Sequence, residues 1–134
     1  MIFKKLTPNM MVPDINKTID FYKDILGFGL LITVPEKGEY DWAIMKSGNV
    51  EIMFQSQASL IKELPHLKDR PLGGGSTLYI EAEDVRDLYD RLSGRVKIIK
   101  ELYTTFYDTC EFSIEDLNGY ILTFAEEENI TEIN

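Results

Sequence analysis

The feature that most constrains this chain is the repetition of one order of structural signals in its two halves. Asp14 and Asp84 each precede a helical pattern, and Asp is favoured at a helix N-terminus because its carboxylate accepts backbone N–H groups. Phe54 and Phe124, each in the last predicted strand of its half, are separated by the same 70 residues as the two aspartates. A constant offset of this kind is typical of a tandem duplication.

The first half predicts a strand, a helix and three further strands. Apolar residues recur three or four positions apart from Ile15 to Leu26, which marks one face of a helix, and Gly27 ends it. Runs of branched and aromatic residues bounded by turn residues predict the strands. These strands are expected at residues 7–12, 28–34, 40–45 and 50–55.

The second half repeats this pattern after a connector. A helix with Asp84 as its cap is expected to begin at Val85 and to end before Gly94. The strands are expected at residues 77–82, 96–103, 107–114 and 120–125. The connector predicts a short helix over residues 58–64 and a flexible hinge at Gly73–Gly75, and the Glu-rich segment after Ala125 is expected to be loosely ordered.

Composition excludes several classes of function. With 134 residues, of which 44% are hydrophobic, the chain suits one compact domain. The net charge of −9 argues against nucleic acid as a partner, because phosphate binding needs clustered Lys and Arg. We expect no membrane partner, since the sequence has neither a long apolar run nor a signal peptide. The single cysteine, Cys110, is consistent with a cytoplasmic location.

Two separated motifs resemble those of a known superfamily. The first runs from Asp14 through Phe21-Tyr22 to Leu26-Gly27-Phe28, and the second is Asp116-Leu-Asn-Gly-Tyr120 followed by Leu122, Phe124 and Glu126. Both resemble the signatures of vicinal oxygen chelate proteins, the glyoxalase/bleomycin resistance protein/dioxygenase type. The resemblance implies an α+β fold of two tandem βαβββ modules that form a curved mixed-sheet cup, and a homodimer.

The resemblance also implies one domain over residues 1–134, with module 1 at about 5–55, the connector at about 56–76 and module 2 at about 77–126. Because side chains alternate along a strand, one face of each sheet is expected to line the cup as a binding site for a small molecule. The side chains expected there are Asn9, Met11, Glu51, Met53, Gln55, Tyr79, Glu81, Tyr107, Glu111 and Thr123.

The metal-dependent members of this superfamily carry four ligands in the cup, usually His, Glu or Gln. The resemblance places these positions at Thr7, Met53, Thr77 and Thr123. Hydroxyl groups and thioethers are poor ligands for such metals, so we expect no cofactor and disfavour a divalent metal. Glu51 is the weak catalytic candidate. With Glu81 and Glu111 it either forms a carboxylate site in a shifted register or is solvated at the rim of the cup.

Three functions remain open from the sequence. The first is a metal-free protein that binds a small aromatic molecule, cationic or neutral, as drug-sequestering relatives do. The second is a lyase, isomerase or dioxygenase of the same superfamily, with or without a metal. The third is a non-catalytic accessory or regulatory dimer module. A shared fold does not choose among them.

Overall fold

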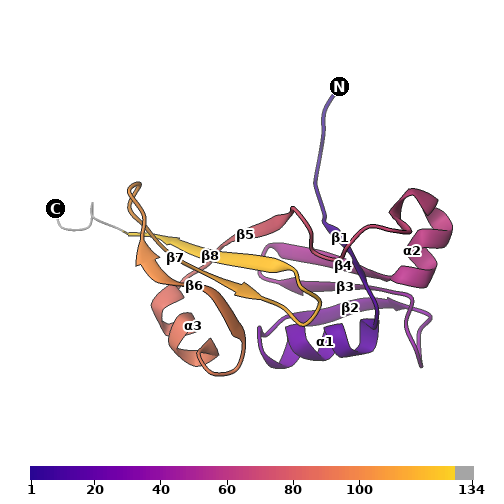
Figure 1. The fold of residues 1–134 in the computed structure, drawn as a ribbon, viewed down its shortest axis with the longest axis horizontal. Coiled ribbons are helices and arrows are strands. Elements are labelled where there is room, and N and C mark those ends of the chain that lie inside the picture. Colours follow the sequence, from indigo (N-terminus) through magenta and orange to yellow (C-terminus); the bar gives the residue numbers. More distant parts are fainter. Residues whose placement is uncertain (129–134) are drawn as a thin grey trace. The chain divides into compact units, whose positions relative to one another are not determined.

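The computed structural model describes residues 1–128, which divide between two compact units: unit 1 is Met1–Leu72, and unit 2 begins at Gly73. Each unit contains one four-stranded mixed sheet, and the βαβββ order is the same in both (Figure 1). The predicted α+β class with two βαβββ modules is therefore confirmed. Among the described residues, no helix is long and apolar enough to cross a membrane.

Unit 1 has the strand order β1-β4-β3-β2, in which β1 runs parallel to β4 and the other pairs are antiparallel. The outermost strands are therefore β1 and β2. Its elements are β1 (Asn9–Val12), α1 (Ile15–Asp24), β2 (Gly29–Val34), β3 (Trp42–Ser47), β4 (Val50–Ser56), α2 (Gln57–Glu63) and the 3₁₀ helix η1 (Pro65–Leu67).

Helix α1 covers one face of the unit 1 sheet. Its N-terminus is capped as predicted, because the Asp14 carboxylate accepts a hydrogen bond from the Lys17 N–H at 3.0 Å. Tyr22 is fully buried, with its ring centroid 5.7 Å from that of Phe28 and 4.8 Å from that of Phe54. These aromatic contacts fix α1 against β4 and form the centre of the unit 1 core.

Helix α2 contacts β4 and β1, and Figure 1 shows it apart from α1, at the end of β4. Gln55 follows Phe54 on β4, so its side chain points away from α1. Its amide donates hydrogen bonds to Ser59 at 3.0 Å and to Glu63 at 3.1 Å, and Leu60 is buried beneath the helix. The short helix predicted in the connector is thus confirmed, and it covers part of the face that was predicted to line the cup.

Unit 2 repeats this topology with the strand order β5-β8-β7-β6, in which β5 is parallel to β8. Phe112 is fully buried, with its ring 5.2 Å from that of Tyr89 on the helix and 5.3 Å from that of Phe124. The elements are β5 (Thr77–Glu81), α3 (Val85–Leu92), β6 (Lys97–Thr104), β7 (Thr109–Glu115) and β8 (Ile121–Glu127).

The prediction that Asp84 caps α3 with its side chain was wrong. Asp84 has a φ of 55°, in the left-handed region, and its side chain makes no cap hydrogen bond. The cap comes instead from β8, where the Glu126 carboxylate accepts the N–H of Asp84 at 2.9 Å and of Val85 at 3.1 Å. A distant carboxylate therefore satisfies the free N–H groups that the local aspartate was expected to satisfy.

The largest differences between the predicted and observed strand boundaries in unit 2 are at the start of β7 and the end of β8. Tyr107 was placed in a strand but lies in the turn before β7, where Asp108 has a φ of 62° and the Thr105 hydroxyl accepts the Thr109 N–H at 3.0 Å. β8 continues to Glu127, so the Glu-rich segment begins inside a strand. The rest of that segment, residues 129–134, lies outside the described residues.

Candidate functional site

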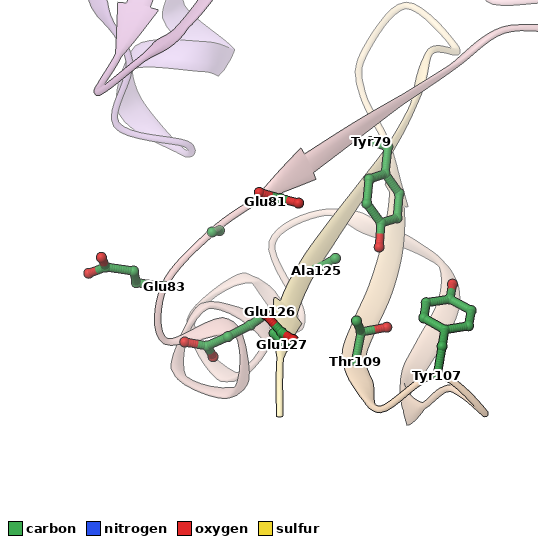
Figure 2. A pocket seen from close by; sticks show the side chains of 9 residues that line it. Tyr79, Glu81, Glu83, Tyr107, Thr109, Ala125, Glu126 and Glu127 are labelled. Carbon is green, nitrogen blue, oxygen red and sulfur yellow. The ribbon is translucent and has the colours of Figure 1, made fainter. Parts of the chain in front are cut away.

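A pocket of about 490 Å³ lies in unit 2, on the sheet face opposite α3 and at the edge where β5 and β8 end. Four of its nine lining residues are glutamates and none is Lys, Arg or His. The lining residues are Tyr79, Glu81, Ala82, Glu83, Tyr107, Thr109, Ala125, Glu126 and Glu127 (Figure 2). A pocket with this lining carries a negative potential that attracts cations.

Beside this pocket, hydroxyl groups converge on the carboxylate of Glu111. Figure 2 shows the hydroxyls of Tyr79, Tyr107 and Thr109 pointing toward one another. All three donate to Oε2 of Glu111, at 2.6 Å from Tyr79, 3.0 Å from Tyr107 and 2.7 Å from Thr109. Tyr103 donates to Oε1 at 3.4 Å. We call Glu111 and these four donors the tyrosine–carboxylate cluster.

The strand register explains how these residues meet. Thr109 and Glu111 are two positions apart on β7 and so share a face, while Tyr103 pairs with Glu111 across the β6–β7 hairpin. Tyr79 lies on β5, which is separated from β7 by β8, and its ring must cross β8 to reach Glu111. Ala125 of β8 pairs with Glu111, and its small side chain leaves room for this crossing.

The cluster holds one charge under many hydroxyl donors. Glu111 is only 3% exposed, and this burial by itself raises the pKa of its carboxyl. Hydrogen bonds from Tyr79, Thr109 and Tyr107 lower it more, so the pKa of Glu111 lies below its ordinary value. The hydrogen bond to Glu111 raises the pKa of Tyr79 to about 12. At neutral pH Glu111 is therefore a carboxylate and the hydroxyl of Tyr79 is protonated.

The glutamates that line the pocket differ in their hydrogen bonding and exposure. Glu126 caps α3 through the N–H groups of Asp84 and Val85. The remaining lining carboxylates, Glu81, Glu83 and Glu127, are exposed. These three residues contribute negative charge to the pocket, and they do not take part in the Glu126 cap of α3.

Five of the predicted cup residues lie in unit 1, on the sheet face opposite α1. The Asn9 amide donates to Gln55 at 2.9 Å, and Gln55 in turn bonds to α2. Met53 pairs with Asn9 and Met11 pairs with Gln55 in the parallel β1–β4 ladder. The structure thus brings Asn9, Met11, Met53 and Gln55 together, with the polar groups of Asn9 and Gln55 already bonded to each other.

Glu51, the fifth of these residues and the weak catalytic candidate, is ion-paired in unit 1. Its carboxylate lies 2.9 Å from the ammonium of Lys5 and 3.9 Å from that of Lys46. The hydrogen bond from Lys5 is the main cause of a pKa below the ordinary value for Glu51. A carboxyl held in its charged form by an ammonium group is a poor proton donor at neutral pH.

The positions that the resemblance gives to metal ligands are placed as follows. Thr7 precedes β1, Met53 lies on β4, and Thr77 is exposed at the start of β5. Thr123 shares a 2.7 Å hydrogen bond with Ser113. Across residues 1–128 no three His, Cys, Asp or Glu side chains form a group that could hold a metal ion. The expectation of no cofactor stays a prediction.

In unit 2 the structure brings Tyr79, Tyr107 and Glu111 together, with Glu81 nearby in the pocket lining. Sequence reasoning treated the tyrosines and the acid as separate contacts for a ligand and missed that they bond to one another. It also left out Glu83, Tyr103, Glu126 and Glu127, and it placed Thr109 on the inward face of its strand without including it among the site residues. The two-residue spacing of Thr109 and Glu111 could have indicated that they share a face of the strand. The position of Tyr103 beside Glu111 can be known only from the register of the β6–β7 hairpin.

Comparison with known families gives a match over most of the chain. A family model described as Glyoxalase/Bleomycin resistance protein/Dioxygenase superfamily matches residues 6–124. No curated protein is similar enough in sequence to count as a match.

Solved structures share the fold at low sequence identity. TioX from Micromonospora sp. ML1 is 17% identical with a TM-score of 0.72, covering 93% of this chain and 99% of that one. A protein of unknown function from Agrobacterium tumefaciens str. C58 is 20% identical with a TM-score of 0.77, covering 95% and 96%. A glyoxalase/bleomycin resistance protein/dioxygenase family enzyme from Burkholderia phytofirmans PsJN is 18% identical with a TM-score of 0.74, covering 90% and 95%. At these identities the similarity shows the fold alone.

Proposed function

The chain belongs to the glyoxalase/bleomycin resistance protein/dioxygenase superfamily, and we propose that it is a metal-free member that binds a small aromatic cation in the pocket of unit 2. The observation that carries this proposal is the lining of the pocket, which combines four glutamates with two tyrosines and contains no basic side chain. Aromatic rings and negative charge in one cavity favour a ligand that has both an apolar body and a positive charge.

The size and position of the pocket support a small ligand. A volume of about 490 Å³ falls within the range of cavities that bind small molecules. Tyr79 and Tyr107 are about half exposed, which leaves aromatic surface available for contact. Phe106 is 97% exposed, and its ring centroid lies 4.9 Å from that of Tyr107, so it adds to the aromatic surface beside the pocket.

Binding of an aromatic cation is tested by calorimetric titration of the purified protein with a panel of aromatic cations that includes benzyltrimethylammonium. We expect saturable binding that is weakened by Ala125→Leu, since a larger side chain at this lining position takes space from the pocket and displaces the Tyr79 ring that crosses β8 there. The matched control is Ala58→Leu on an exposed position of α2, which should leave binding unchanged. An absence of saturable binding across the whole panel would overturn the proposal.

The metal-free part of the proposal is supported by the chemistry of the family positions, where Thr7, Thr77 and Thr123 offer hydroxyls and Met53 a thioether. The test is the metal content per chain of untagged protein purified without chelators, before and after soaking in zinc, nickel, manganese and iron(II). A content near zero supports metal-free binding. About one tightly held ion per chain would contradict it and would favour a metal-dependent lyase, isomerase or dioxygenase.

We also propose that the protein is a homodimer, with β2 in the interface. β2 is an outer strand of the unit 1 sheet, and its apolar side chains are exposed: Leu30 by 41%, Leu31 by 53%, Ile32 by 57% and Val34 by 52%. An apolar outer strand with free backbone hydrogen-bonding groups invites pairing with another chain. A second copy of this strand is the partner we propose.

A further inference from the structure

The exposed parts of Tyr79 and Tyr107 are mostly aromatic ring. These side chains are 54% and 50% exposed, whereas Glu111, which accepts both hydroxyls, is 3% exposed. Since each hydroxyl is turned toward a buried carboxylate, the surface left for a ligand is mainly ring carbon. A molecule in the pocket therefore meets two rings whose polar ends are already bonded.

Glu111 itself has little capacity left to bind a ligand. Three hydroxyls donate to Oε2, although a carboxylate oxygen offers only about two lone-pair directions. Glu126 is likewise bonded to the N-terminus of α3. A primary ammonium, which needs acceptors for three N–H groups, finds neither of these carboxylates free. The other lining carboxylates, Glu81, Glu83 and Glu127, are exposed, and an ion pair with an ammonium group at an exposed carboxylate adds little free energy.

The same hydrogen bonds make the rings better partners for a cation. A phenol that donates to a carboxylate gains electron density in its ring, because hydrogen-bonded groups polarise one another at a site of low dielectric constant. The face of such a ring attracts a positive charge more strongly. A cation whose charge is shielded by methyl groups gains most, since it gives up little hydration and needs no acceptor.

We infer that Glu111 is a positioning residue which, by holding the hydroxyls of Tyr79 and Tyr107, makes this pocket select quaternary ammonium compounds over primary amines. This inference rests on the proposed function, because it names the class of cation that the same pocket takes. Glu111 acts through the two rings and does not itself contact the ligand.

The first test compares two probes that share a benzyl group and a single positive charge, benzyltrimethylammonium and benzylammonium, by calorimetry on the full chain. We expect the quaternary compound to bind at least about tenfold more tightly, the effect of a favourable cation contact with the two rings. If neither probe binds, this inference fails, and the proposed function fails with it only if the rest of the panel also shows no binding. If both bind equally well, the proposed function stands and this inference is overturned.

The second test asks whether Glu111 causes the selectivity. Glu111→Gln should reduce the preference for the quaternary probe to about threefold or less, because a neutral amide polarises the rings less. The matched control is Glu115→Gln on the same strand, whose carboxylate pairs with Lys97 at 2.9 Å and does not line the pocket. That control should keep the full preference, and an unchanged preference in Glu111→Gln would overturn the role of Glu111.

A variant that keeps Glu111 covers the case in which Glu111→Gln does not fold. The double substitution Tyr79→Phe with Tyr107→Phe retains both rings and removes both hydroxyls, and we expect it to lose the preference in the same way. Tyrosine absorbance near 295 nm gives an independent readout. The most basic tyrosine ionisation of the native chain should disappear in Tyr79→Phe, and its persistence would contradict the bond on which the inference depends.

Discussion

The hydroxyl of Tyr79 lies 2.6 Å from the carboxylate of Glu111, although the two residues are on strands that are not neighbours in the sheet. β8 separates β5 from β7, so this hydrogen bond spans three strands of the unit 2 sheet. It joins the first strand of the module to the strand that carries the buried charge. The bond therefore contributes to the stability of the sheet and, at the same time, fixes one wall of the pocket.

Stability should fall in acid because of Glu111. Its pKa is lowered in the folded chain, so its stabilising contribution is fully present above about pH 4.5 and is lost as the pH falls below this value and through the folded pKa. Glu111→Gln should flatten this part of the curve of unfolding free energy against pH, measured by urea denaturation. Glu51→Gln gives a separate comparison in unit 1: because the pKa of Glu51 is also lowered, this substitution should flatten the curve independently of Glu111. A curve for Glu111→Gln that keeps the native slope would contradict this assignment.

Stability should also fall in alkali because of Tyr79. Its pKa is raised to about 12 in the folded chain from an ordinary value of 10.0, so the hydrogen bond contributes fully below pH 10. The contribution is lost as the pH rises from about 10 to 12. Tyr79→Phe should remove the part of this dependence that comes from Tyr79, leaving that of Tyr89, whose pKa is also raised, and at neutral pH it should lower the unfolding free energy by roughly 1 kcal/mol. The prediction is wrong if native and variant chains lose stability in parallel over this range.

The cap of α3 gives a prediction that separates two acidic neighbours. Glu126→Ala removes the acceptor for the N–H groups of Asp84 and Val85 and should lower the unfolding free energy by about 1–2 kcal/mol. Glu127→Ala, at the next and exposed position, should change it by less than about 0.5 kcal/mol. Thermal or urea unfolding of the two variants measures the difference, and equal losses would refute the capping role.

Substitution of Asp84 tests directly whether its side chain contributes to the cap of α3. Because its side chain does not cap α3 and its φ is 55°, Asp84→Gly should change the unfolding free energy by less than about 0.5 kcal/mol. Asp14→Ala in unit 1, where the carboxylate accepts the Lys17 N–H, should cost about 1 kcal/mol. If the two substitutions cost the same, the difference between the two caps is not real.

The order of elements in both modules could be predicted from sequence because it depends on local signals. Helical periodicity, turn residues and alternation located α1, α3 and the strands, and they put Tyr79 and Glu111 on the same face of their sheet. Alternation says which face a side chain occupies but does not say which strands are neighbours. The hydrogen bond between Tyr79 and Glu111 depends on the order β5-β8-β7, which no local pattern fixes.

The two helix caps also show that local sequence patterns do not predict tertiary contacts. Asp14 and Asp84 occupy equivalent positions in the repeat, yet only Asp14 caps with its side chain. In unit 2 the carboxylate of Glu126 arrives from the last strand and takes that role. A residue type at a cap position predicts that a helix begins there, but the group that satisfies the helix is chosen by tertiary packing.

Association through β2 predicts a charge-sensitive dimer. Ile32→Lys places an ammonium group on the exposed apolar strand and should shift the protein from dimer to monomer in sedimentation or light scattering. The control is Ser47→Lys, at an exposed position at the end of β3, which should leave the dimer intact. A native chain that is monomeric at all concentrations, or a dimer unaffected by Ile32→Lys, would contradict the proposed interface.

Gly73 and Gly75 give a final prediction about the segment that was expected to be a flexible hinge. Both have positive φ angles, 70° and 80°, but their surroundings differ. A Cβ at Gly73 would lie 2.3 Å from the Gly119 carbonyl oxygen and 2.7 Å from its carbon, in the turn between β7 and β8, whereas nothing lies within 4 Å at Gly75. Gly73→Ala therefore combines a backbone clash with left-handed strain and should lower the unfolding free energy by about 3 kcal/mol. Gly75→Ala carries only the strain and should cost about 1 kcal/mol, so equal effects of the two substitutions in urea denaturation would show that Gly73 does not pack against this turn.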